Sequence, residues 1–288
     1  MKKTILDLYA MKTAGEKAVW MVTYDALFAS YAEKAGIDML LVGDSVGMGV
    51  YGYAGTVRVT MDMMVLHAQA VRRGAPNTYI IGDMPFGSYH ISCEDAVANA
   101  VRLVKECDVD AIKLEGGMAV ADKVRAIANA GIVVFGHVGL TPQSSAALGG
   151  FKAQGKTTDS ARAVIEDAVA VYRAGARVVL LEGVPEEVCA FVHRLLPCPV
   201  YGIGAGAQCD GQVLLHTDLL GMFTDFTPKF AKQYKQLAHL ATEGIREYID
   251  ETKSGAFPAA AHKYTLSDSL DAFDALFAEM ADELEGSL

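Results

Sequence analysis

Four short apolar runs in this chain each end in an acidic residue beside glycine, and this repeated pattern constrains the fold more than any other feature. The first run is Met-Leu-Leu-Val-Gly-Asp at residues 39–44, and the others lie at residues 80–83, 112–117 and 179–183. Such a run is too short for a helix core but suits a strand that is buried on both faces. The pattern therefore places a carboxylate at the carboxyl end of each of four buried strands.

Strand and helix patterns alternate along most of the chain. The predicted strands cover residues 18–23, 39–42, 78–82, 111–115, 132–136, 177–181, 199–203 and 212–215. The predicted helices cover residues 3–13, 25–35, 60–73, 92–106, 119–130, 159–174 and 185–196. Eight strands that alternate with helices indicate an α/β fold of the closed (β/α)8 type, the TIM barrel. A doubly wound open sheet is the alternative, because the eighth strand has the least regular pattern.

The last part of the chain is predicted to be helical. Two helical stretches lie at about residues 229–253 and 267–284, with a glycine- and proline-containing joint at residues 254–258 between them. No change in composition marks a linker. We therefore expect a single barrel domain over residues 1–288, with a C-terminal helical extension over about residues 229–288.

Charge and composition exclude several classes of protein. The net charge of −10 argues against nucleic-acid binding, which needs a basic surface. No apolar run is long enough to cross a bilayer, and the first residues lack the apolar core of a signal peptide. The five cysteines include no C-x-x-C pair, so they are interpreted as reduced thiols. We expect a cytoplasmic protein with no membrane partner and no nucleic-acid partner.

Three of the strand-end acids form a candidate metal site. In a TIM barrel the active site lies at the carboxyl ends of the strands, where Asp44, Asp83 and Glu115 are expected. Their hard oxygen donors suit Mg²⁺ and give zinc no advantage. The alternative is that each acid caps the helix after it. The recurrence of the pattern favours the shared site.

Lys113 and Glu115 are two residues apart on one predicted strand, so both side chains point to the same face. In a barrel this face is the interior, where an unpaired ammonium group is costly. A bound carboxylate or the charge of Glu115 can satisfy the lysine. A purely structural ion pair is the alternative.

Three other features also follow predicted strands. Glu182 lies outside the proposed metal cluster and is therefore available as a general base. Its apolar neighbours are expected to favour the neutral carboxyl group. His137 can either donate a hydrogen bond to a substrate or fix the loop that it opens. The run Gly-Ile-Gly-Ala-Gly at residues 202–206 is typical of a phosphate-binding loop, or of close backbone packing at the barrel rim.

Taken together, several stretches resemble the ketopantoate hydroxymethyltransferase (3-methyl-2-oxobutanoate hydroxymethyltransferase) family of pantothenate biosynthesis. The matching stretches are GDSVGM (43–48), residues 59–76, GDMPFGSY (82–89), IKLEGG (112–117), GHVGLTPQS (136–144), GGFKAQGKT (149–157), LLEGVP (180–185), GIGAGAQCDGQVL (202–214) and PKFAKQY (228–234). They extend from about residue 5 to residue 260, which makes the resemblance far more specific than any single motif.

The resemblance implies a TIM barrel that binds one Mg²⁺ per subunit and 2-oxoisovalerate, with 5,10-methylenetetrahydrofolate as the one-carbon donor. It also implies a homodecamer of two pentameric rings. The residues that match the family's metal site are Asp44, Asp83 and Glu115. Those that match its contacts to the oxoacid are Asp44, Ser45, Asp83 and Lys113. Glu182 matches its proton acceptor, and His137 remains a candidate substrate contact.

The implied chemistry agrees with the residues. Mg²⁺ that chelates a 2-oxoacid stabilises its enolate, and a nearby carboxylate can take the proton from C3. The chain departs from the family in the loop at residues 50–56, which usually reads V-Q-G-H-D-T, and in a longer tail beyond residue 264. The competing hypotheses are a Mg²⁺-dependent C–C lyase of the isocitrate lyase and phosphoenolpyruvate mutase type and a non-catalytic barrel. The lyases need a cysteine in a lysine-rich loop, and this chain has none.

Overall fold

The structure is a computed structural model, and it describes residues 2–224 and 226–285. The chain divides into two compact units, residues 1–236 and residues 237–288. The strands are β1 Ala18–Val22, β2 Met39–Val42, β3 Tyr79–Asp83, β4 Ala111–Glu115, β5 Val134–Gly139, β6 Val178–Glu182, β7 Val200–Ile203 and β8 Gly211–Leu215. The α-helices of the first unit are α1 Ile5–Ala14, α2 Ala26–Lys34, α3 Val46–Gly49, α4 Met61–Gly74, α5 Cys93–Cys107, α6 Ala121–Asn129, α7 Thr158–Ala174, α8 Glu186–Leu195 and α9 His216–Leu219. Its 3₁₀ turns are η1 Met118–Val120 and η2 Pro142–Ser144.

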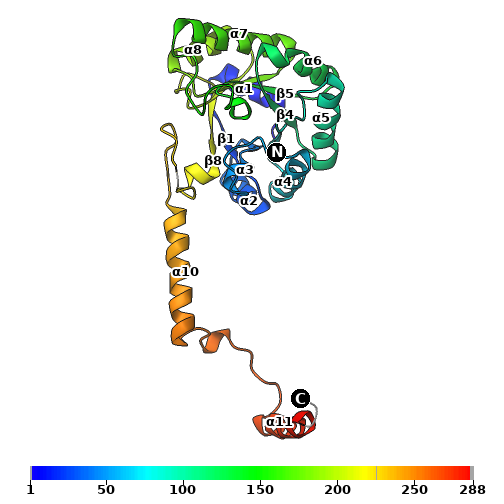
Figure 1. The fold of residues 1–288 in the computed structure, drawn as a ribbon, viewed down its shortest axis with the longest axis vertical. Coiled ribbons are helices and arrows are strands. Elements are labelled where there is room, and N and C mark those ends of the chain that lie inside the picture. The colour runs from blue at the N-terminus through cyan, green and yellow to red at the C-terminus, as the bar shows by residue number, and fades with distance from the viewer. Residues whose placement is uncertain (1, 225, 286–288) are drawn as a thin grey trace. The chain divides into compact units, whose positions relative to one another are not determined.

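The eight strands form a closed barrel in sequence order, and every neighbouring pair is parallel. Strand β1 closes the barrel by pairing with β8 as well as β2, so Trp20 lies opposite both Met39 and Val213. The larger helices of the first unit surround the strands (Figure 1). The predicted TIM barrel is confirmed, and the open-sheet alternative is wrong.

An aromatic layer fills the barrel interior below its active end. Trp20, Tyr79, Phe135 and Tyr201 come from the odd-numbered strands and are all buried. The ring centroids of Trp20 lie 5.9 Å from Phe135 and 5.3 Å from Tyr201. Four side chains from alternate strands make one layer in such barrels. This layer forms a rigid floor under the residues that come later in each strand.

The opposite end of the barrel is held by aspartates that precede strands. Their carboxylates accept hydrogen bonds from backbone N–H groups of neighbouring strands, with Asp38 bonded to Val19, Asp110 to Ile80 and Asp210 to Val200. Each also pairs with a lysine near the amino terminus, and the pairs are Lys3–Asp38, Lys2–Asp110 and Lys12–Asp210. The segment containing α1 therefore closes this end of the barrel.

Helix capping is done by residues other than the strand-end acids. The carboxylate of Asp25 accepts from Phe28 N at the start of α2, and the hydroxyl groups of Thr60, Ser92 and Thr157 cap α4, α5 and α7. Ser45, Gly117 and Pro185 occupy the cap positions of α3, η1 and α8. The capping alternative for the four acids is therefore wrong.

Two local predictions were wrong in detail. The glycines at residues 47–56 predict an irregular loop, but its first residues belong to the single turn α3, and Tyr53 N donates to Gly47 O of this turn at 2.8 Å. The last helices begin later than expected, with α10 at Leu237–Ser254, the turn η3 at Ala260–His262 and α11 at Leu270–Glu285. Residues 229–236 bond to the barrel instead, because Tyr234 N donates to Leu219 O. Within the described residues, no helix is long and apolar enough to cross a membrane.

Candidate active site

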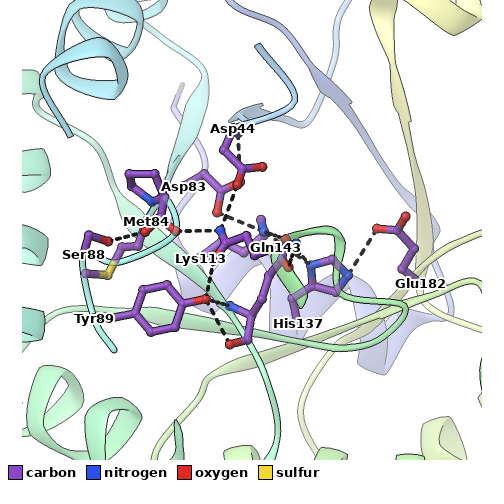
Figure 2. A network of polar contacts seen from close by, with 11 residues as sticks. Asp44, Asp83, Met84, Ser88, Tyr89, Lys113, His137, Gln143 and Glu182 are labelled. Atoms are coloured by element: carbon purple, nitrogen blue, oxygen red, sulfur yellow. Dashed lines mark hydrogen bonds and ion pairs between the residues drawn. The ribbon is translucent and has the colours of Figure 1, made fainter. Parts of the chain in front are cut away.

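The residues predicted from the strand ends meet in one cavity of about 930 Å³ at the carboxyl end of the barrel. The predicted residues that line it are Asp44, Ser45, Asp83, Lys113, Glu115, His137 and Glu182. Strand register brings them together, because Asp83 lies opposite Lys113 and Glu115 lies opposite His137. The predicted residues thus lie together in one cavity, and Figure 2 shows the polar network that they form.

Lys113 is the central cation of this network. Its Nζ lies 2.9 Å from Asp83 Oδ1, 3.3 Å from Glu115 Oε1 and 3.3 Å from His137 Nδ1. Burial lowers the pKa of Lys113, but the surrounding carboxylates outweigh burial and raise it above its ordinary value. The lysine therefore stays charged, and it contacts more groups than a simple Lys–Glu pair.

The carboxylates around Lys113 differ in how far nearby cations and hydrogen-bond donors balance their negative charge. Burial, followed by repulsion from Asp83 and Glu115, raises the pKa of Asp44 well above its ordinary value. Burial also raises the pKa of Asp83, although Lys113 opposes this. For Glu115 burial is outweighed by Lys113, His137 and the backbone N–H of Gln143, so its pKa falls to about 2. Negative charge is therefore in excess around Asp44 and Asp83.

Glu115 uses both oxygens in contacts within the protein. Its Oε1 lies near Lys113 and His137, and its Oε2 accepts from Gln143 N at 3.0 Å. Asp83 Oδ1, in contrast, is near Lys113 but lacks hydrogen-bond alignment, so that contact is an ion pair only. In the described part of the chain, no three His, Cys, Asp or Glu side chains converge as ligands of one metal ion.

His137 connects the lysine cluster to Glu182. Its Nδ1 lies 3.5 Å from Glu115 Oε1, and its Nε2 lies 3.2 Å from Glu182 Oε2. Burial and Lys113 lower the pKa of His137, but its contacts with the two glutamates outweigh them and raise it to about 9. The surroundings of Glu182 are thus less apolar than expected. His137 itself lies within β5, which extends to Gly139, so it does not open a loop.

Comparison with known proteins settles the family. The family model described as ketopantoate hydroxymethyltransferase matches residues 2–260. The chain belongs to this family. It is 56% identical to the 3-methyl-2-oxobutanoate hydroxymethyltransferase of Alkaliphilus metalliredigens over 278 residues, which cover 96% of this chain and 98% of that protein. It is 51% identical to the enzyme of the same name from Desulfotalea psychrophila, over 93% of this chain and 96% of that protein.

Solved structures with the same barrel are more distant in sequence. One is a 2,3-dimethylmalate lyase, with a TM-score of 0.60 and 18% identity, covering 90% of this chain and 88% of that one. Another is a phosphonopyruvate hydrolase, with a TM-score of 0.59 and 14% identity over 99% of both chains. These similarities show the fold alone. As a ketopantoate hydroxymethyltransferase family member, the chain is a hydroxymethyltransferase of pantothenate biosynthesis.

Gln143 and Tyr89 belong to the site but were not identified from the sequence. Gln143 Nε2 donates to Asp44 Oδ2 at 2.8 Å, and Tyr89 Oη donates to Gln143 Oε1 at 2.6 Å. Tyr89 Oη also accepts from Glu115 N at 3.2 Å. Both residues are buried. The only sequence signal for them was their place in stretches that match the ketopantoate hydroxymethyltransferase family.

The loop that departs from the family pattern is held by aromatic contacts. Tyr51 Oη and His67 Nε2 are 2.9 Å apart, and the rings of Tyr51 and Tyr53 stack at 5.7 Å. The guanidinium group of Arg58 lies 4.5 Å from the ring centroid of Tyr53. Of these residues none lines the cavity, whereas Thr56 does. The altered loop is therefore held by contacts among its own tyrosines and by contacts with His67 of α4 and with Arg58.

The glycine run at residues 202–206 serves close packing. A Cβ on Gly204 would lie 2.6 Å from the ring of Phe230, and one on Gly206 would lie 2.5 Å from Glu186. The carboxylate of Glu186 also accepts from Ala207 N at 3.0 Å, which disfavours a phosphate at this point. Ser45, the remaining predicted contact, is half-buried, and its Oγ lies 2.8 Å from Tyr24 Oη.

Proposed function

We propose that this chain transfers a hydroxymethyl group from 5,10-methylenetetrahydrofolate to 2-oxoisovalerate and so forms ketopantoate. The observation that supports this most is the chain of contacts from Lys113 through His137 to Glu182, which joins an anion-binding cation to a separate carboxylate. Membership of the family supplies the substrates. The C–C lyase alternative lacks its cysteine, because none of the cavity-lining residues is a cysteine.

The donor set fits a divalent cation. At the ends of β2 to β6, the carboxylates of Asp44, Asp83, Glu115 and Glu182 outnumber the cationic groups, which are Lys113 and His137. The raised pKa of Asp44 reflects this excess of negative charge, which a hard dication would balance. Asp44 and Asp83 would hold one Mg²⁺ per subunit, with Glu115 as the third carboxylate. When bound, the cation polarises the ketone and carboxylate oxygens of the oxoacid.

Each protein group then has a specific task. Lys113, with Ser45, binds the oxoacid oxygens and favours the negative charge that develops there. Glu182 accepts the proton from C3. His137, whose Nε2 lies 3.2 Å from Glu182 Oε2, positions this carboxylate.

The remaining bonds follow from the substrates. The C3 carbanion attacks the methylene carbon of the folate, a new C–C bond forms, and the bonds from that carbon to the folate nitrogens break. Water supplies the hydroxyl oxygen, and tetrahydrofolate leaves. The aromatic floor of Trp20, Tyr79, Phe135 and Tyr201 closes the barrel below this reaction.

We further infer a homodecamer and a cytoplasmic location. Large apolar side chains such as Ile91 and Leu66 are exposed on the first unit, which supports burial against other subunits. All five cysteines are free, as is usual in a reducing compartment.

The test is the formation of ketopantoate from 2-oxoisovalerate and 5,10-methylenetetrahydrofolate, with and without Mg²⁺. Deuterium exchange at C3 of the oxoacid, measured without folate, separates proton removal from carbon transfer. Absence of both reactions in the presence of Mg²⁺ would refute the proposed function.

A further inference from the structure

The cavity has a polar half and an apolar half. The polar half is formed by the ends of β2 to β6, as described above. The apolar wall follows β7 and β8, and its residues are Ile203, Leu215, Phe223, Phe226 and Phe230. The volume of about 930 Å³ is near the upper end for small-molecule sites, and a small oxoacid at Lys113 fills only part of it.

Asp218 is one of two charged residues of the apolar half, and the other is Lys229. It belongs to the short helix α9, lines the cavity and is 7% exposed. Within residues 2–224 and 226–285, its carboxylate takes part in no hydrogen bond or ion pair. Burial alone raises its pKa to about 6. A buried carboxylate without a donor costs free energy unless a ligand supplies one.

The charge of Asp218 decides which ligand it can accept. It repels the carboxylate of the oxoacid, which Lys113 attracts to the other half of the cavity. The hydroxyl group of Tyr24 is close enough to Asp218 and to Asp44 for both charges to raise its pKa. The partner of Asp218 must therefore be rich in N–H groups, and the aromatic wall indicates that it is also flat.

We propose that Asp218 binds the pterin ring of the folate donor, by accepting hydrogen bonds from its 2-amino group and the adjacent ring N–H. The phenylalanines of the apolar wall contact the faces of the ring. This inference rests on the proposed function, because that function supplies the folate. It assigns a specificity-determining residue that acts on the folate and has no part in proton removal.

The experiment compares Asp218→Asn with Glu16→Gln, a control that changes an exposed carboxylate without any side-chain contact. In Asp218→Asn, the KM for 5,10-methylenetetrahydrofolate should rise roughly 10- to 100-fold, because hydrogen bonds to a charged group are lost. Deuterium exchange at C3, which needs no folate, should keep the wild-type rate and so report correct folding. The Glu16→Gln control should match the wild type in both measurements.

A folate analogue provides the second arm. Tetrahydrofolate with a methyl group in place of its 2-amino group keeps only the ring N–H as a donor to Asp218. Its affinities for wild type and Asp218→Asn, measured by equilibrium dialysis, should therefore differ less than those of unmodified tetrahydrofolate. Unmodified tetrahydrofolate should distinguish the two proteins. An unchanged folate affinity in Asp218→Asn, or a loss of C3 exchange, would overturn the assignment. Failure of the proposed function itself is distinguishable, because wild type would then form no ketopantoate whatever the result for Asp218.

Discussion

His137 Nε2 lies 3.2 Å from Glu182 Oε2, so two neighbouring strands bring an imidazole and a carboxylate into ion-pair contact. The same imidazole contacts Glu115 on its other side. This shared histidine lies between the proposed proton acceptor and the groups proposed to bind the oxoacid, and the first two predictions follow from it.

Replacing Glu182 with glutamine should slow exchange of the C3 hydrogen by about 10²–10⁴-fold, because a general base contributes that much to a rate. The affinities for 2-oxoisovalerate and Mg²⁺ should change little, since Glu182 is proposed to contact neither. Proton NMR in deuterated water measures the exchange. If the Glu182→Gln variant exchanged this hydrogen at the wild-type rate, Glu182 would not be the general base.

The contribution of His137 to stability should depend on pH. Its pKa of about 9 in the folded protein lies above the ordinary value of 6.5, so the protonated ring stabilises the fold fully below about pH 6.5. This contribution is lost as pH rises through about 9. The difference in free energy of unfolding between wild type and His137→Gln should therefore shrink over that range in urea titrations. A constant difference would mean that the ring is neutral throughout.

Asp44→Asn should stabilise the metal-free protein while abolishing its response to Mg²⁺. The substitution removes a buried charge that Asp83 and Glu115 repel, and the amide oxygen still accepts from Gln143. We expect a gain of about 1–2 kcal/mol, or roughly 2–8 °C in Tm. Calorimetry with and without Mg²⁺ tests this, with Glu16→Gln as the control. A lower Tm without metal would show that the Asp44 charge is already compensated.

The protein should form a large ring assembly in solution. Ile91 is 81% exposed and Leu66 is 64% exposed in the isolated chain, so both are available for subunit contacts. Light scattering should give a mass about ten times the 30.7 kDa of one chain. A monomer at micromolar concentration would contradict this expectation.

The residues that the sequence revealed share one property, which is a fixed position relative to a strand. Asp83, Lys113 and Glu115 end short apolar runs, and strand period and barrel closure then determine which way they point. Gln143 and Asp218 lie in segments without such a period. Their positions depend on contacts with residues that are distant in the sequence, such as the contact of Gln143 with Asp44. Local sequence patterns do not indicate such contacts.

The start of α10 illustrates the same limit. Residues 229–236 have a helical pattern, yet the backbone bond from Tyr234 to Leu219 holds this stretch against the barrel. Tertiary contacts outweighed local propensity there. In the barrel itself, local propensity and tertiary contacts favour the same strands, and its eight strands were therefore predictable.

The closure of the barrel by its first strand and first helix has a consequence during synthesis on the ribosome. Strand β1 lacks one of its two neighbours until β8 exists, and Lys12 lacks Asp210 until that residue has emerged. The amino-terminal segment must therefore wait for almost the whole barrel to be translated before it can complete its bonds. Its exposed strand edge is the part of the nascent chain most in need of protection by a chaperone.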